Sequence, residues 1–235
     1  LANPGIILAH AIAAITSSTR EIKVPQWRLD EIPGSVQEVL RELTVDQDEN
    51  SPDIDPHWGE PGLTPPEQVF GWNSFEVLAF ETGNPKNPAN AIPPKAFAHC
   101  QVRFVVPTDP EQLLPALRKF LDERGFSNVE LSAQGKAARA TRLDPDHPWV
   151  KWVITSIGAT TGKEVAVIPN LGGTLPNDVF AEILGLPTIW VPHSYSGCSQ
   201  HAANEHLLGS VSREALRIMT GIWWDLGEME LPAGH

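Results

Sequence analysis

The sequence predicts a chain of two parts, an α+β sandwich of ferredoxin-like type followed by an α/β unit. In the first part, residues 1–138, strand-like runs lie between helical ones, as in an antiparallel sheet that carries helices on one face. In the second part, residues 139–235, helical and strand-like runs alternate, which is typical of βαβ units and a largely parallel sheet. The pattern changes near residues 134–145, where we expect the boundary.

The first part begins with a mixture of short elements. Residues 5–17 are an apolar helix-like run after an Asn-Pro breaker pair, residues 21–25 a short strand and residues 35–44 a helix. The acidic, proline-rich residues 45–72 are predicted to form a long loop. Loops of that length are excursions from a compact domain or covers of a site.

Two strands form the centre of the predicted antiparallel sheet. Residues 74–83 and 96–107 are rich in β-branched and aromatic residues, and the prolines between them exclude regular structure. A helix follows, with Asp109 as its cap and Gly125 as its stop, and residues 128–135 close the unit as another strand. The helix places five apolar residues on one face, Leu113, Leu114, Leu117, Phe120 and Leu121.

The second part alternates between helices and strands. Helices are predicted over residues 149–162, 176–185 and 210–227, and strands over residues 164–168 and 188–191. In α/β proteins the loops that follow the carboxyl ends of parallel strands carry the site. Two loops, NLGGTLPND and HSYSGCSQHAANEH, follow the predicted strands and are therefore the candidate site.

The composition excludes some partners and favours one compartment. The chain has 17 basic and 29 acidic residues and a net charge of -12, so we expect no nucleic acid and no membrane surface as partner. No apolar run reaches the roughly 18 to 20 residues of a membrane span. The two cysteines, Cys100 and Cys198, are too few for a disulfide framework and suit the cytoplasm. Because the chain opens on Leu1 inside a structural unit, we expect a fragment or a processed chain.

Each of the two candidate loops is ambiguous alone. The double glycine, Gly172-Gly173, lets backbone N–H groups approach a ligand but is more often a tight turn. A neutral imidazole such as that of His201 is the commonest metal ligand, but one of eight histidines is more often a solvated side chain. The two loops together are more specific than either alone.

The segment GGTLPNDVFAEILGLPTIWVPHSYSGCSQHAANEH resembles the carboxyl-terminal segment of the M20 family of dinuclear-metal peptidases and amidohydrolases. The family pattern is Gly-Gly-Ser/Thr-x-Pro, a strand, and His-x-x-Asn/Asp-Glu, whose histidine ligates one of two metals. That position is His201 in this sequence. In the first part, Asn90 in NAIPP and Arg103 in VRFVVP resemble two motifs of the family's lid, or dimerisation, domain.

The resemblance spans essentially the whole chain and implies a fold and a reaction. Residues 1–138 would be a ferredoxin-like lid domain, and residues 139–235 the carboxyl-terminal part of a phosphorylase/hydrolase-like α/β zinc-peptidase domain. The family hydrolyses amide or peptide bonds of small substrates, such as N-acyl amino acids and dipeptides. Its water is activated by two divalent ions, zinc foremost, with manganese or cobalt as alternatives. The lid would also make a homodimer.

By the same resemblance, Asn90 and Arg103 would hold a substrate carboxylate or the developing oxyanion, and Gly173 and Thr174 would line the pocket. The alternative for Arg103 is an exposed strand residue in a salt bridge. Asn170 is a departure, because dipeptidase-like members have arginine there. Recognition of a peptide's terminal carboxylate by that arginine has no counterpart at this position, which leaves open a non-peptide amide or an acid that is anchored differently.

The sequence lacks the family's other metal motifs, His-x-Asp and Asp-Glu-Glu, and with them the general-base glutamate. A catalytic zinc takes three protein ligands. We therefore expect these residues alone to be inactive, with His201 as their single metal ligand. Two functions stay open: the carboxyl-terminal part of a metal-dependent hydrolase, or a non-catalytic lid or interaction module that keeps the fold without the metal centre.

Overall fold

The computed structural model describes residues 1–45, 53–135, 137–173 and 175–232, and the described residues have a mixed α/β fold with a small antiparallel sheet. The mixed class predicted from the sequence is confirmed. The helices are α1 (Pro4–Ile15), α2 (Gly34–Glu42), α3 (Pro65–Phe70), α4 (Pro110–Asp122), α5 (Pro148–Thr161) and α6 (Gly209–Glu228), the strands are β1 (Ser74–Thr82) and β2 (Ala96–Arg103), and the short turns are η1 (Pro25–Trp27), η2 (Val179–Ile183) and η3 (Ser196–Cys198).

Local sequence signals account for where the helices begin and end. The side chain of Asn3 accepts from the backbone N–H of Gly5 at 3.0 Å, and Asp109 caps α4 as predicted. Helix α5 ends on Gly162 in the left-handed conformation. Helix α3 lies inside the segment predicted as a loop. Its two prolines suggest a loop, but proline is tolerated in the first turn of a helix.

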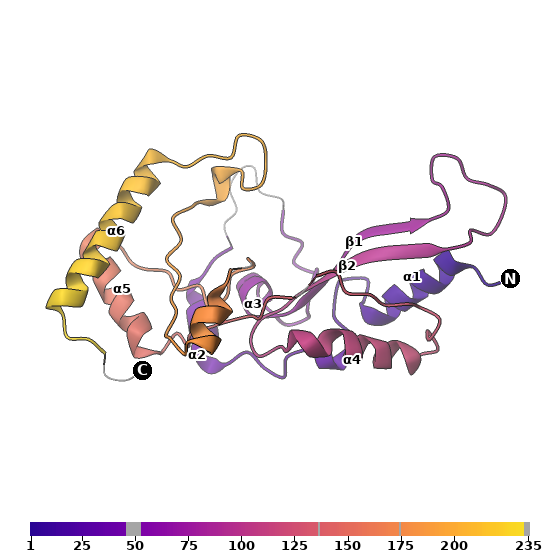
Figure 1. Cartoon of the computed structure of the whole chain (residues 1–235), viewed down its shortest axis with the longest axis horizontal. Coiled ribbons are helices and arrows are strands. Elements are labelled where there is room, and N and C mark those ends of the chain that lie inside the picture. Colours follow the sequence, from indigo (N-terminus) through magenta and orange to yellow (C-terminus); the bar gives the residue numbers. More distant parts are fainter. Residues whose placement is uncertain (46–52, 136, 174, 233–235) are drawn as a thin grey trace.

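The strand hairpin β1–β2 positions the candidate residues of the first part (Figure 1). The strands pair antiparallel, with Ser74 opposite Arg103 at one end and Thr82 opposite Ala96 at the other. A bulge lies between Val77 and Ala79. The connection from β1 to β2 projects beyond the sheet, and the candidate arginine lies at the opposite end of the hairpin.

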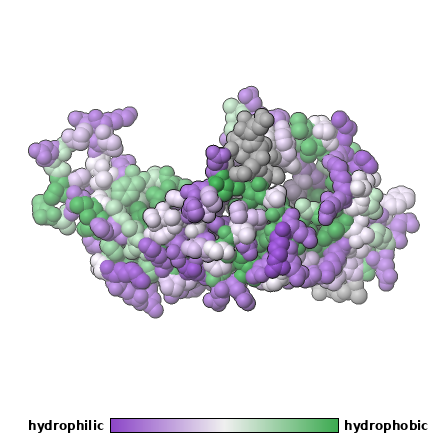
Figure 2. All heavy atoms as spheres, turned by 180° about the vertical axis from the view of Figure 1, so that it is seen from behind, coloured by the Kyte–Doolittle hydropathy of each residue, from purple (hydrophilic) through white to green (hydrophobic). Residues whose placement is uncertain are grey.

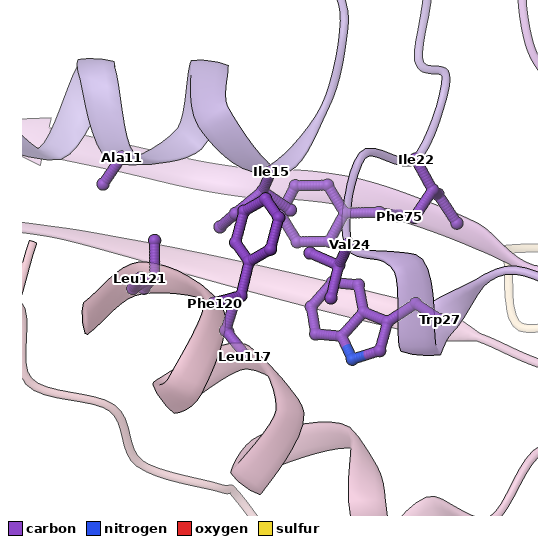
Figure 3. Close-up of a cluster of buried hydrophobic side chains, with 9 residues drawn as sticks. All are labelled: Ala11, Ile15, Ile22, Val24, Trp27, Phe75, Leu117, Phe120 and Leu121. Atoms are coloured by element: carbon purple, nitrogen blue, oxygen red, sulfur yellow. The ribbon is translucent and has the colours of Figure 1, made fainter. Parts of the chain in front are cut away.

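Helices α1 and α4 pack with the start of β1 around one apolar core (Figure 3). Trp27 is 2% exposed, packs against Phe75 with 5.7 Å between ring centroids and 37° between the ring planes, and donates its indole N–H to the carbonyl of Leu113 at 3.0 Å. Leu114 was predicted on the buried face of α4 but stays 38% exposed at its edge. The core residues are Ala11, Ile15, Ile22, Val24, Trp27, Phe75, Leu117, Phe120 and Leu121.

Four segments predicted as strands are not strands in the described residues, so the predicted parallel sheet of the second part is not formed there. A strand needs backbone partners on a neighbouring strand. The first of the four segments makes only the isolated bridge between Thr16 and Ile22, and the predicted helix 176–185 contracts to the turn η2. The four segments are residues 21–25, 128–135, 164–168 and 188–191.

Helices α5 and α6 pack against each other in the second part (Figure 1). Gly221 allows the close approach, since a Cβ there would lie 2.0 Å from Thr160 Oγ1. Lys163 forms an ion pair with Glu214. None of the helices in the described parts of the chain combines the length and the apolar character that a membrane crossing requires. The domain boundary at residue 138 stays a prediction.

Candidate functional site

The double-glycine loop lies against the first part of the chain. The side-chain amide of Asn170 donates to the carbonyl of Phe70, the last residue of α3, at 2.6 Å. Gly172 lies under the guanidinium of Arg103, because a Cβ on Gly172 would be 3.2 Å from Arg103 Nη1. A Cβ on Gly173 would have nothing within 4 Å. Thr174, the other predicted lining residue, lies outside the described residues.

Arg103 is therefore available to an anion at this loop. Its side chain is at the carboxyl end of β2 and is exposed. No carboxylate among the described residues forms an ion pair with it. Guanidinium donors and the backbone of a glycine pair can together surround a carboxylate. The salt-bridge alternative for Arg103 has no partner within the described chain.

Asn90 lies far from this loop. It is exposed in the connection between β1 and β2, whereas Arg103 is at the other end of the hairpin. At about 3.3 Å per strand residue, the length of β2 separates the two ends by roughly 23 Å. The structure thus brings Arg103 and the double glycine together but does not bring Asn90 to them within one chain.

His201 lies at the tip of a loop built from tight turns. Its imidazole is exposed and its backbone is left-handed, with a φ of 60°. Ser199 and Asn204 are also left-handed, with φ values of 57° and 63°. Non-glycine residues seldom adopt this conformation, and such strain persists only where surrounding contacts hold it. The amide of Ala202 donates to the carbonyl of Ser199 at 2.9 Å.

The base of the same loop carries contacts that sequence reasoning missed. Tyr195 Oη lies 2.5 Å from His206 Nε2, and the two rings meet edge to face at 5.8 Å. The amide of His206 donates to the carbonyl of Cys198 at 3.0 Å. Cys198 is buried and its thiol accepts from Ser194 Oγ at 3.3 Å. No sequence motif pairs a tyrosine with a histidine 11 residues later, so only the structure identifies this contact.

The described residues do not make a metal centre by themselves. Within the described ranges, no group of three or more histidine, cysteine, aspartate or glutamate side chains could hold an ion. His201 can supply one imidazole, whereas a catalytic zinc takes three protein ligands. The residues present therefore fit a single position in the coordination sphere of a metal and no more.

The comparisons with known proteins cover both parts of the chain. The model of the M20 peptidase dimerisation domain matches residues 1–129. No curated protein matches the sequence. Among solved structures, the M20 family metallo-carboxypeptidase Sso-CP2 from Sulfolobus solfataricus superposes with a TM-score of 0.73 at 21% identity, covering 94% of this chain and 52% of that chain.

Two dipeptidase structures are similar as well. Dug1p from Saccharomyces cerevisiae has a TM-score of 0.64 at 16% identity and covers 94% of this chain and 48% of its own. Human carnosine dipeptidase 1 has a TM-score of 0.64 at 14% identity and covers 97% of this chain and 50% of its own. The chain thus spans about half the length of these solved structures. At these identities the likeness shows the fold.

The match to the dimerisation domain extends over more than half of the 235 residues. The structural likeness continues through the second part, where the double-glycine and His201 loops lie. By these two findings, the chain belongs to the M20 family of metallopeptidases.

Proposed function

We propose that this chain is the carboxyl-terminal part of a metal-dependent hydrolase that cleaves an amide or peptide bond in a small substrate. N-acyl amino acids, dipeptides and related amides are the substrate classes. The single observation that supports this most is the position of Arg103 over Gly172 in a chain of this family. Two divalent ions, zinc foremost, would need ligands beyond His201. The side chains of this chain would bind and orient the substrate.

The chain's contribution to substrate binding is an anion anchor. The planar guanidinium of Arg103 can donate two parallel hydrogen bonds to a carboxylate. Asn170 cannot take the part that arginine has in dipeptidase-like members, because its amide is engaged by the carbonyl of Phe70. It holds the loop in place beneath Arg103 instead. A substrate with a free carboxylate therefore fits this site better than a neutral amide.

A glycine substitution tests whether Arg103 and the double-glycine loop anchor the substrate or form a structural contact only. In the full-length enzyme, Gly172→Ala should push against Arg103 and raise KM for a carboxylate-bearing substrate roughly 10-fold, with a smaller change in kcat. Gly227→Ala, near the end of α6, is the matched control, because its Cβ would also meet nothing within 4 Å and Gly227 has no part in the anchor. Steady-state kinetics on N-acyl amino acids measures both variants. Equal KM values for the two would remove Arg103 from the anchor.

We also propose a homodimer that forms through the lid domain. Both strands of the hairpin lack a further partner within the described residues, and an exposed strand edge favours pairing with another chain. Apolar residues gather among polar ones on the side of the molecule that carries the hairpin when it is seen from behind (Figure 2). Exposed apolar residues of the hairpin strands are Val77, Leu78, Phe80 and Phe97. A dimer edge here would bury surface that is otherwise costly to expose.

In such a dimer, Asn90 would serve the partner's site. It lies in the connection beyond the end of β2 that is opposite Arg103, and the strand alone spans roughly 23 Å. The two residues can therefore act on one substrate only if different protomers supply them. The two lid motifs would then act from two copies of the chain, with each site composed of Arg103 from one protomer and Asn90 from the other.

Mixing two inactive variants tests this arrangement. Full-length Asn90→Ala and Arg103→Ala, unfolded together and refolded in equal amounts, should recover about a quarter of wild-type activity, since half of the dimers are mixed and each has one intact site of two. Each variant refolded alone is the control. If both residues serve the site of their own protomer, no mixed dimer has an intact site and the mixture stays inactive.

The metal role of His201 has a direct test. In the full-length protein, His201→Ala should reduce kcat roughly 100-fold or more and lower the metal content, because one ion loses an imidazole ligand. His10→Ala, at an exposed position on α1, is the matched control and should change neither. Measurement by metal analysis and amide hydrolysis would show unchanged values for His201→Ala if the chain is a non-catalytic module.

We further propose a cytoplasmic location, with which the two free cysteines agree.

A further inference from the structure

We infer that Tyr195 and His206 are positioning residues that close the loop 194–206 and hold His201 in its exposed, left-handed presentation. The pair lies at the two ends of the loop, and His201 lies at the tip between them. We call the contact between Tyr195 and His206 the clasp. Its importance for catalysis rests on the proposed function, whereas the clasp itself can be tested on the chain alone.

The hydrogen bonds of His206 define its tautomer. Its Nδ1 lies 2.8 Å from the carbonyl oxygen of Asn204, which can only accept a hydrogen bond. In the neutral imidazole Nδ1 therefore carries the proton, which leaves Nε2 as an acceptor. Tyr195 Oη, at 2.5 Å, is the donor to Nε2. One imidazole thus connects the first residues of the loop to the carbonyl of Asn204, three residues beyond His201.

Other contacts close the same loop from inside. The amide of His206 donates to the carbonyl of Cys198, and the amide of Cys198 donates to the carbonyl of Tyr195 at 3.2 Å. Between these contacts, Ser199, His201 and Asn204 are left-handed although none is glycine. Such residues relax to commoner conformations when nothing restrains them. The clasp restrains these residues at both ends of the loop. Its loss would free the backbone around His201, so its imidazole would no longer be held in one direction.

Variants of the clasp separate its two hydrogen bonds. Tyr195→Phe removes the donor to Nε2 and keeps the ring contact. His206→Gln places a side-chain carbonyl near the position of Nε2, so it keeps an acceptor for Tyr195 and should rescue the loop in part. His206→Ala removes both bonds. If the clasp holds the loop, loop mobility should increase in the order wild type, His206→Gln, Tyr195→Phe, His206→Ala.

Hydrogen exchange on the 235-residue chain measures this order. In Tyr195→Phe, the amides of Ala202, Glu205 and His206 should exchange at least about tenfold faster, while those of α5 and α6 keep their rates. The ¹⁵N shifts of His206 should show the proton on Nδ1 in the wild type. The inference is overturned if the loop amides keep their rates, if all amides accelerate equally, or if the proton resides on Nε2.

The full-length enzyme separates this inference from the proposed function. Tyr195→Phe should lower kcat and metal content with little change in KM, the opposite of the pattern expected for Gly172→Ala. A loop that loosens in the chain alone, with metal content and kcat unchanged in the full-length enzyme, would confirm the clasp and count against His201 as a metal ligand. If the loop does not loosen, the clasp is ruled out, and the test of His201→Ala is unaffected.

Discussion

The packing of α1 and α4 around Trp27 and Phe75 is the constraint on which the arrangement of the first part depends. It fixes one face and one end of the β1–β2 hairpin, and the register of the hairpin then fixes Arg103 at that end. Asn90 is placed at the other end by the same register. A slip of one residue would turn every strand side chain to the opposite face, so the position of the proposed anion anchor depends on an apolar core with no chemical function of its own.

A hydrogen bond and a close approach connect the first part of the chain to the second. Asn170 binds the end of α3, and Gly172 leaves room for the guanidinium of Arg103. These two features act together. The hydrogen bond of Asn170 brings the loop close, and the absence of a side chain on Gly172 permits the approach. The His201 loop is held separately by its own clasp, so the anion anchor and the candidate metal ligand are supported by independent contacts.

The sequence could predict the elements whose signals are local. Asn3, Asp109 and Gly162 mark helix ends that the structure confirms, because a cap acts on the backbone within a few residues. The segments 164–168 and 188–191 look like strands, yet strand formation depends on distant partners that the described residues do not provide. Likewise, the motifs identified Arg103 and the double glycine, but their contact joins residues far apart in the chain. The contact between Tyr195 and His206 has no sequence signal at all.

We propose that this chain supplies one metal ligand and an anion anchor to a site that it does not complete. Calorimetric titration of the purified 235-residue chain with zinc tests it most directly. We expect no tight stoichiometric binding, because one imidazole among the described residues cannot replace the three protein ligands of a catalytic zinc. Tight binding of one zinc per chain that His201→Ala abolishes would contradict it.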